Sequence, residues 1–299
     1  MGKIAFIFPG QGAQYIGMGK PLYDKYAAAR QVYDTADAEF VKNISWSGTK
    51  EDLTATKIAQ PAIFLADLAA AAALNERGIS AAGAAGFSLG EIPALAFCGL
   101  LDVKEAFKFV CFRAEVMHEC TLKHKGGMMA VLGLSDETVK ELCQGLNGAY
   151  PVNFNSPGQV VVAYSAEAGE ALKASIVATK GKVMPLTVAG AFHSPLMDDA
   201  AAKVADYLTK VDFSESTIPL YSNVTAKTYN NPKELLAKHV NNPVLWQATI
   251  KQMITDGYDT FIETGPGKTL TGMIKKIDKN VRTFNVFDEE SLEESVKNV

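Results

Sequence analysis

The residues best suited to chemistry form a G-x-S-x-G pattern, Gly86-Phe87-Ser88-Leu89-Gly90. In this pattern a serine sits on a strained turn between a strand and a helix, with its hydroxyl exposed and a helix N-terminus behind it. The glycines let the backbone turn sharply and let the flanking elements approach each other closely. A glycine-rich turn carrying an ordinary serine has the same five residues, so the rest of the chain must decide between the two interpretations.

A serine hydroxyl becomes a good nucleophile only when a base removes its proton. The chain has four histidines. His193 is the favoured base for Ser88, because it lies in a loop expected between a strand and a helix, where catalytic groups are often found. By itself it would be explained as a structural histidine. His118 and His124 flank the entry to an expected insertion, and His239 lies in a polar helical stretch.

No acid completes a serine–histidine–acid triad in the sequence. Asp102 and Asp136 lie between Ser88 and His193, as the order of an α/β-hydrolase requires. Each is explained more simply as a helix cap. A dyad, with the imidazole held by backbone carbonyls, is the alternative.

Two glycine-containing loops do not fit nucleotide-binding motifs. After Phe8 the chain reads Pro9-Gly10-Gln11-Gly12-Ala13-Gln14, with Tyr15 where a dinucleotide motif needs its third glycine. Gly267-Lys268-Thr269 fails as a P-loop, because Ile262 stands at the position of its first glycine. The first loop is either a plain turn or a source of N–H groups, with the Gln11 amide, for a developing oxyanion.

Arg113 lies on a predicted helix that is otherwise rich in apolar residues. An arginine in such surroundings pairs either with a nearby carboxylate, here Glu115 or Glu119, or with a carboxylate of the substrate. A guanidinium binds a carboxylate with two parallel hydrogen bonds, which makes the second interpretation chemically specific.

The predicted elements place these residues in an α/β fold with an inserted unit. The first part alternates strands and helices, with a strand over 3–8 and helical segments over 18–40, 60–78, 91–101 and 103–119. From residue 128 the order becomes βαββαβ, which is typical of a ferredoxin-like unit, over 128–132, 135–146, 151–155, 159–163, 166–179 and 182–187.

We therefore predict a large α/β subdomain over 1–122 and 188–299, interrupted by a ferredoxin-like small subdomain over 123–187. Helical patterns resume after the insertion, with a late strand over 260–263. Residues 288–299 are polar and acidic, which predicts a solvated terminus.

Composition limits the function. With 299 residues, 48% of them hydrophobic, the chain can bury a large core, and its net charge of −4 argues against a nucleic-acid binder. We expect no secretory signal and no membrane span, since the apolar run over 62–74 is short and contains Asp67, which favours a buried helix. The four cysteines lack metal-ligand spacing, so free thiols in the cytoplasm and no metal are expected.

The motifs together resemble malonyl-CoA:acyl-carrier-protein transacylases over about residues 3 to 280. They are Phe8-Pro9-Gly10-Gln11-Gly12, Gly86-Phe87-Ser88-Leu89-Gly90-Glu91, Arg113, Asn153-Phe154-Asn155-Ser156-Pro157-Gly158-Gln159, Phe192-His193-Ser194 and Gly265-Pro266-Gly267-Lys268. The resemblance implies a hydrolase-like large subdomain with a ferredoxin-like small one, in agreement with the insertion predicted above.

The resemblance also implies roles for single residues. Ser88 would be the acylated nucleophile and His193 its base, Arg113 would bind the malonyl carboxylate, and the backbone amides of Gln11 and Leu89 would form the oxyanion hole. Malonyl-CoA would be a substrate and acyl carrier protein its partner in fatty-acid biosynthesis, with no cofactor, in a cytoplasmic monomer.

Several positions refine the resemblance. Gly190-Ala191-Phe192-His193 resembles the sequence with which related polyketide acyltransferases select malonyl units, so Phe192 is expected to contact the substrate. Phe87 stands where many members have histidine, and Leu245 replaces a glutamine whose backbone carbonyl helps orient the catalytic histidine. The adjacent Lys275 and Lys276 either dock the acidic carrier protein through complementary charge or form a solvated helix end.

Two other functions share part of this evidence. A thioesterase would release the acyl group to water, and it would be distinguished by a triad acid that the sequence does not show. A docking subunit without chemistry would not need both Ser88 and His193.

Overall fold

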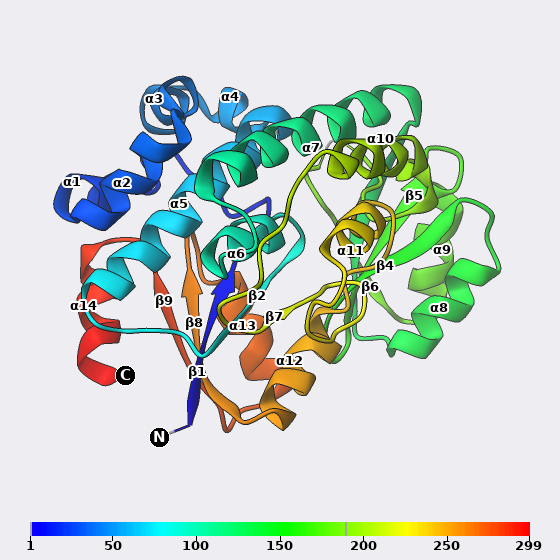
Figure 1. The fold of residues 1–299 in the computed structure, drawn as a ribbon. Helices are drawn as coiled ribbons and strands as arrows, with labels where there is room; N and C mark the ends of the chain where they lie inside the picture. The colour runs from blue at the N-terminus through cyan, green and yellow to red at the C-terminus, as the bar shows by residue number, and fades with distance from the viewer. Residues whose placement is uncertain (1, 189) are drawn as a thin grey trace.

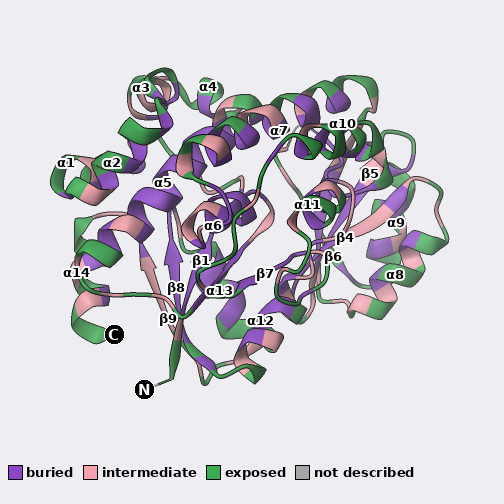
Figure 2. Ribbon diagram, viewed as in Figure 1, coloured by how far each residue is buried: buried purple, intermediate pink, exposed green. Residues whose placement is uncertain are grey.

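The first predicted strand lies at the centre of a parallel sheet. The computed structural model describes residues 2–188 and 190–299. Its five-stranded sheet has the order β7-β2-β1-β8-β9 with all strands parallel (Figure 1). The strands are β1 (Lys3–Phe8), β2 (Gly83–Gly86), β7 (Leu220–Tyr221), β8 (Tyr258–Thr264) and β9 (Arg282–Val286). Parallel strands are buried on both faces, and Figure 2 shows buried residues along β1 and β8.

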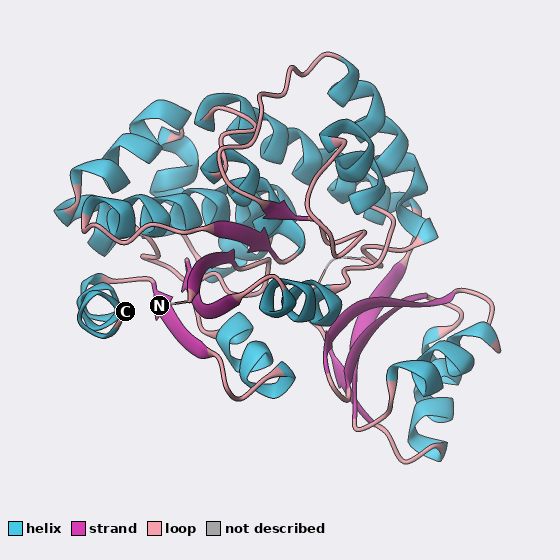
Figure 3. Ribbon diagram, turned by 60° about the horizontal axis from the view of Figure 1, so that its bottom comes forward, coloured by secondary structure: helices cyan, strands magenta, loops and turns pink. Residues whose placement is uncertain are grey.

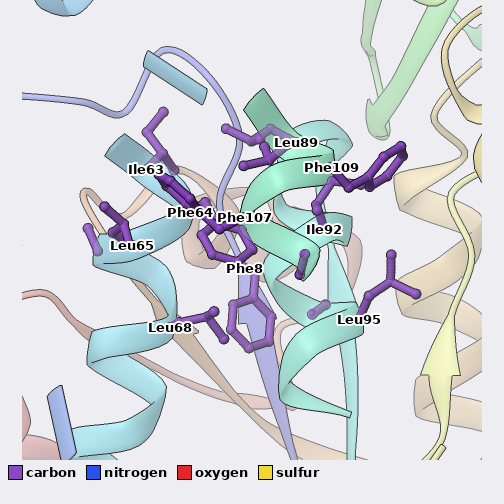
Figure 4. Packing of buried hydrophobic residues seen from close by; sticks show 14 of the residues in the cluster. Phe8, Ile63, Phe64, Leu65, Leu68, Leu89, Ile92, Leu95, Phe107 and Phe109 are labelled. Atoms are coloured by element: carbon purple, nitrogen blue, oxygen red, sulfur yellow. The ribbon is translucent and has the colours of Figure 1, made fainter. Parts of the chain in front are cut away.

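Three helices pack together beside this sheet and form much of the core. They are α5 (Thr56–Glu76), α6 (Glu91–Phe97) and α7 (Val103–Lys123). Figure 4 shows Phe8, at the end of β1, among apolar side chains of these helices, including Leu68, Ile92 and Phe107. By length and composition α5 could cross a membrane, yet 83% of its apolar window is buried in the structure. It is the buried helix that the sequence predicted.

The predicted helical segment over 18–40 is divided into several short helices. They are α1 (Lys20–Lys25), α2 (Ala27–Ala36) and α3 (Glu39–Ser47), followed by α4 (Lys50–Thr54). The chain leaves the helical conformation at Tyr26, whose backbone is extended, and at Asp37, whose φ is 52°. The predicted helix over 91–101 also ends earlier, at Phe97, since Gly99 takes a φ of 79°.

The second sheet is antiparallel and confirms the ferredoxin-like unit. Its strands are β3 (Gly126–Leu132), β4 (Ala149–Ser156), β5 (Gln159–Ser165) and β6 (Lys182–Pro185), in the order β4-β5-β3-β6. The helices α8 (Asp136–Gln144) and α9 (Gly169–Ala178) complete the βαββαβ order. Figure 3 shows this sheet and its two helices beside the parallel sheet. The exact boundaries at 122 and 187 stay a prediction.

The remaining helices follow the insertion, and the last one corrects an expectation. They are α10 (Asp198–Thr209), α11 (Pro232–His239), α12 (Trp246–Thr255), α13 (Thr269–Ile277) and α14 (Glu289–Asn298). The terminus that was predicted to be solvated instead forms α14. Its Leu292 is completely buried, and its Glu293 accepts a hydrogen bond from Arg77. The spacing of the apolar residues gives this acidic helix one buried face. The overall polar composition does not reveal that face.

Candidate active site

The serine pattern forms the predicted turn between strand and helix. Strand β2 ends at Gly86, and Ser88 begins a short 3-10 helix, Ser88–Gly90, that leads directly into α6. Ser88 has a φ of 52°, which is strained for a residue with a Cβ. A Cβ added to Gly90 would lie 2.0 Å from the carbonyl oxygen of Phe8. Glycine is therefore required here by the close approach of β1 to the turn.

His193 lies against this serine. The distance from Ser88 Oγ to His193 Nε2 is 2.6 Å, and the second ring nitrogen, Nδ1, lies 2.9 Å from the carbonyl oxygen of His239. Because a carbonyl can only accept, Nδ1 carries the proton and the lone pair of Nε2 faces the serine hydroxyl. Burial, helped by the charge of Arg113, lowers the pKa of His193 to about 4. The imidazole is neutral at pH 7, as a base must be.

The orienting group is a carbonyl, and it comes from an unexpected residue. Nδ1 of His193 bonds to the His239 carbonyl, at the end of α11, while the Leu245 carbonyl accepts from the backbone and hydroxyl of Thr249. Asp102 caps α7, as predicted. The cap of α8 is Ser135 rather than Asp136, because the serine hydroxyl accepts from the Thr138 N–H.

A cavity of about 240 Å³ opens at the dyad, between the two sheets. The first loop contributes Gln11, and the serine turn contributes Phe87, Ser88 and Leu89. The opposite wall comes from the antiparallel sheet and is mainly apolar, with Met128, Ala130, Val161 and Met184. Phe192 also lines the cavity, next to His193, so the structure brings this predicted contact residue to the site.

The structure places both predicted oxyanion-hole residues at the cavity. Leu89 is the second residue of the 3-10 helix, where backbone N–H groups have no intrahelical acceptor. Among the described residues, the Gln11 N–H has no hydrogen-bond partner. The Gln11 side chain points elsewhere, with its amide nitrogen 3.4 Å from Thr56 Oγ1. Both residues therefore line the cavity, while the side-chain amide of Gln11 is directed to Thr56; their role as an oxyanion hole stays a prediction.

Arg113 is buried behind Gln60 and does not itself line the cavity. No carboxylate of the described residues forms a hydrogen bond or salt bridge with it, although the charge of Glu91 partly offsets the lowering of its pKa by burial. The Arg113 side chain is 1% exposed, and its Nη1 donates to Gln60 Oε1 at 2.6 Å. The expected pairing with Glu115 or Glu119 is wrong, since Glu115 is exposed and Glu119 bonds to Lys203. The Nε and Nη2 atoms have no hydrogen-bond partner among the described residues. Burial lowers the pKa of Arg113 to about 10, so it stays charged at pH 7.

Sequence reasoning missed Gln60, which connects Arg113 to the cavity. Gln60 lines the cavity together with Met117, and its amide nitrogen lies 3.8 Å from the Met117 sulfur. The available signal was a glutamine in the apolar helix α5, where it is 2% exposed. A buried polar side chain in such a helix needs a partner, and here the partner is Arg113.

Two predicted features lie at the edge of the site. Phe87 packs edge-on against Trp246, with ring centroids 5.6 Å apart, so this position offers an apolar wall. Lys275 and Lys276 are exposed in the last turn of α13, and Lys276 Nζ lies 3.4 Å from Oε1 of Gln159, which lines the cavity. Lys276 therefore lies next to a residue of the cavity lining, and the role of the two lysines as a docking surface stays a prediction.

The site combines a serine turn on a parallel α/β sheet, a neutral histidine held by a carbonyl and a buried arginine near the cavity, and these groups are suited to an acyltransferase. Residues 5–291 match the family model described as the acyl transferase domain. The malonyl CoA-acyl carrier protein transacylases of Bacillus subtilis and Escherichia coli K12 are 38% and 36% identical. These alignments cover 99% and 93% of this chain and 97% and 93% of the relatives.

Solved structures agree with these relatives. The malonyl CoA-acyl carrier protein transacylase of Clostridium perfringens matches with a TM-score of 0.94 and 35% identity, over 99% of this chain and 96% of that one. A malonyl-transacylase in complex with its type II PKS acyl-carrier protein matches with a TM-score of 0.93 and 33% identity. The match covers 99% of this chain and 100% of that chain. The chain therefore belongs to the malonyl CoA-acyl carrier protein transacylase family.

Proposed function

We propose that this enzyme moves a malonyl group from malonyl-CoA to the phosphopantetheine thiol of acyl carrier protein, through a malonyl-serine intermediate on Ser88, for fatty-acid biosynthesis. The observation that carries the proposal is the 2.6 Å contact between Ser88 Oγ and His193 Nε2, near a buried arginine whose Nε and Nη2 bond to no described residue. The names of the relatives support the same donor and acceptor.

In the first half-reaction Ser88 attacks the thioester carbonyl of malonyl-CoA. His193 Nε2 takes the hydroxyl proton as the new C–O bond forms, and the carbonyl oxygen becomes an oxyanion. The backbone N–H groups of Gln11 and Leu89 would stabilise this charge. The intermediate collapses by breaking the C–S bond, and the proton on His193 goes to the departing CoA thiolate.

The second half-reaction reverses these steps with a different thiol. His193 takes the proton of the phosphopantetheine thiol, the sulfur attacks the malonyl ester, and the C–O bond to Ser88 breaks. The proton returns from His193 to the serine oxygen. The enzyme ends in its initial state, so the two thiols use one site in turn.

Arg113 would select the malonyl group through its carboxylate. Nε and Nη2 form one edge of the guanidinium, and both are free of partners among the described residues. A carboxylate accepts two parallel hydrogen bonds from such an edge. Because Gln60 already occupies Nη1, it would orient that edge for the substrate.

Lys275 and Lys276 would attract the carrier protein. Carrier proteins of this pathway are acidic, and opposite charges speed the encounter between two proteins. Lys276 lies next to Gln159 at the cavity, so a carrier protein docked on this turn of α13 would be near the path of its prosthetic group to Ser88.

The mass of the intact protein tests the proposal directly. Wild type mixed with malonyl-CoA should gain one malonyl group, and Ser88→Ala, with its fold intact, should gain none. Adding carrier protein that bears its phosphopantetheine arm should move the group to the carrier. Turnover to free malonate without carrier would identify a thioesterase instead, and a malonyl group on Ser88→Ala would remove Ser88 as the nucleophile.

A further inference from the structure

Three buried polar side chains lie behind the dyad and are not used by the steps above. Glu91 and Asn223 are 0% exposed, and His239 is 1% exposed. Burying polar groups is unfavourable unless they are hydrogen-bonded, so three of them in one place call for an explanation. Their contacts join them into one unit that reaches both Ser88 and His193.

Asn223 holds the serine turn from both ends. Its Nδ2 donates to the Gly86 carbonyl at 2.5 Å, and its Oδ1 accepts from the Ser88 N–H at 2.7 Å. These partners fix which end of the amide is oxygen. The two bonds span Phe87, so the amide closes the strained turn that gives Ser88 its φ of 52°. A strained backbone conformation persists only when surrounding contacts stabilise it, and the two hydrogen bonds of Asn223 provide this stabilisation.

Asn223 is itself fixed through its backbone. Its N–H donates to Glu91 Oε2 at 2.8 Å, and its carbonyl accepts from the Leu245 N–H at 2.8 Å. The other carboxylate oxygen of Glu91 accepts from the Tyr229 hydroxyl. Glu91 is the first residue of α6, directly after the serine turn. The unit therefore ties the loop around Asn223 to the helix that follows the nucleophile.

His239 connects the same amide to the base. Its Nε2 lies 3.3 Å from Asn223 Oδ1, and an amide oxygen can only accept, so His239 donates through Nε2. Through its backbone, the same residue accepts the Nδ1–H of His193 at 2.9 Å. The His239 carbonyl orients His193, and the His239 side chain bonds to the Asn223 amide that holds the turn of Ser88. His239 thus links the two residues of the dyad.

We propose that Asn223 and His239 are positioning residues that keep Ser88 and His193 in register. Asn223 holds the turn of Ser88, and the Nε2–H of His239 bonds the carbonyl-bearing end of α11 to that turn. In a triad an acid gives the imidazole its orientation. Here the backbone carbonyl does so, and the His239 side chain keeps that carbonyl in place. The inference rests on the proposed role of the dyad as nucleophile and base.

The test compares two substitutions of His239. His239→Leu removes the donor and keeps an apolar side chain, whereas His239→Gln keeps an N–H that can reach Asn223. The readouts are the single-turnover malonylation of Ser88 and the labelling of Ser88 by a fluorophosphonate, which needs the dyad but no malonyl group or CoA. We expect His239→Leu to slow both reactions about ten- to a hundredfold, since small misplacements of reacting groups have effects of this size.

The conservative variant and a control separate positioning from packing. His239→Gln should recover most of both rates, with the KM for malonyl-CoA close to the wild-type value in both variants. Thr249→Val is the control, because Thr249 is also buried in this region and, among the described residues, its hydroxyl bonds only to the Leu245 carbonyl. It should change neither rate.

Two results would overturn the inference. One is His239→Leu reacting at the wild-type rate, whatever its Tm, and the other is His239→Gln reacting as slowly as His239→Leu. If His239→Leu does not fold, Asn223→Asp replaces it, since its second carboxylate oxygen cannot donate to Gly86. A wild-type labelling rate in that variant would also exclude the role. If malonyl-CoA does not acylate the wild type but the labelling pattern holds, the proposed function fails and the positioning stands.

Discussion

Arg113 donates from Nη1 to Gln60 Oε1 at 2.6 Å, and this bond leaves Nε and Nη2, one edge of the guanidinium, without a partner among the described residues. The charge of Glu91 partly offsets the lowering of the Arg113 pKa by burial, but no described carboxylate bonds to the guanidinium, and burial of a charged group without a bonded partner is unfavourable. Under the proposed function, the malonyl carboxylate would supply the missing partner. The bond to Gln60 would then leave the Nε and Nη2 edge for that carboxylate.

Replacing Arg113 should reverse the preference for the acyl group. In Arg113→Ala, kcat/KM for malonyl-CoA should fall by about a few hundredfold or more, because losing a buried charged pair costs about 3–5 kcal/mol. Acetyl-CoA should gain relative activity, since the penalty for a substrate without a carboxylate disappears. Both thioesters are measured in both proteins. An unchanged ratio of malonyl to acetyl transfer would exclude Arg113 from carboxylate binding.

Gln60→Glu should give the same change of preference without removing the cation. A carboxylate at position 60 would pair with Arg113 and imitate the bound substrate. We expect malonyl transfer to fall about a hundredfold while acetyl transfer changes little, since charge-assisted pairs are among the stronger polar contacts. The comparison uses kcat/KM for both thioesters, with Gln60→Leu as the control that removes the bond but adds no charge. Equal losses for both thioesters in Gln60→Glu would show that Gln60 acts only in packing.

The pH dependence of acylation should reflect the lowered pKa of His193. Because the neutral imidazole is the active form and its pKa is about 4, kcat/KM should stay level from neutral pH to about pH 5 and fall only below it. A histidine of ordinary pKa would lose activity near pH 6.5. Glu91, whose pKa burial raises to about 7, is the other group to consider, and Glu91→Gln identifies its contribution. A loss centred near pH 6.5 in both proteins would contradict an assignment of the base to a buried, neutral His193.

The same shift affects stability. In the unfolded chain His193 binds a proton near pH 6.5, whereas in the folded chain it does so only near pH 4. The unfolded state therefore binds more protons between these values, and the free energy of unfolding falls as the pH falls through this window. Rates at low pH should thus be measured after brief exposure, with the folded fraction followed by circular dichroism.

The sequence could predict those parts of the site that follow from local patterns. The serine turn is signalled by five neighbouring residues, Gly86 to Gly90, and the order of short strands predicted the ferredoxin-like unit. Gln60 and the His239 carbonyl could not be predicted. Their roles depend on distances between elements far apart in the chain, and a backbone carbonyl has no signal in the residue type. The buried face of α14 was missed because charged residues dominate its composition.

The C-terminal helix should contribute measurably to stability. Leu292 is completely buried, so Leu292→Ala should lower the free energy of unfolding by about 2–5 kcal/mol through lost burial and the cavity it leaves. Glu294→Ala, on the exposed face of the same helix, should change it by less than about 0.5 kcal/mol. Urea unfolding of the three proteins makes the comparison. Equal stability of wild type and Leu292→Ala would mean that α14 does not take part in the cooperative fold.

Charge reversal on α13 should separate the two half-reactions. In the double variant Lys275→Glu with Lys276→Glu, the KM for carrier protein should rise about tenfold at low salt, because attraction to an acidic partner becomes repulsion. Acylation by malonyl-CoA should be unchanged, since neither lysine lines the cavity. The difference between variant and wild type should shrink as salt is added, as expected for exposed charges. The matched control is Lys210→Glu, a reversal in a salt bridge at the end of α10 whose lysine is 78% exposed. If the double variant keeps the wild-type KM for carrier protein at low salt, or if Lys210→Glu raises it equally, these lysines are not the docking surface.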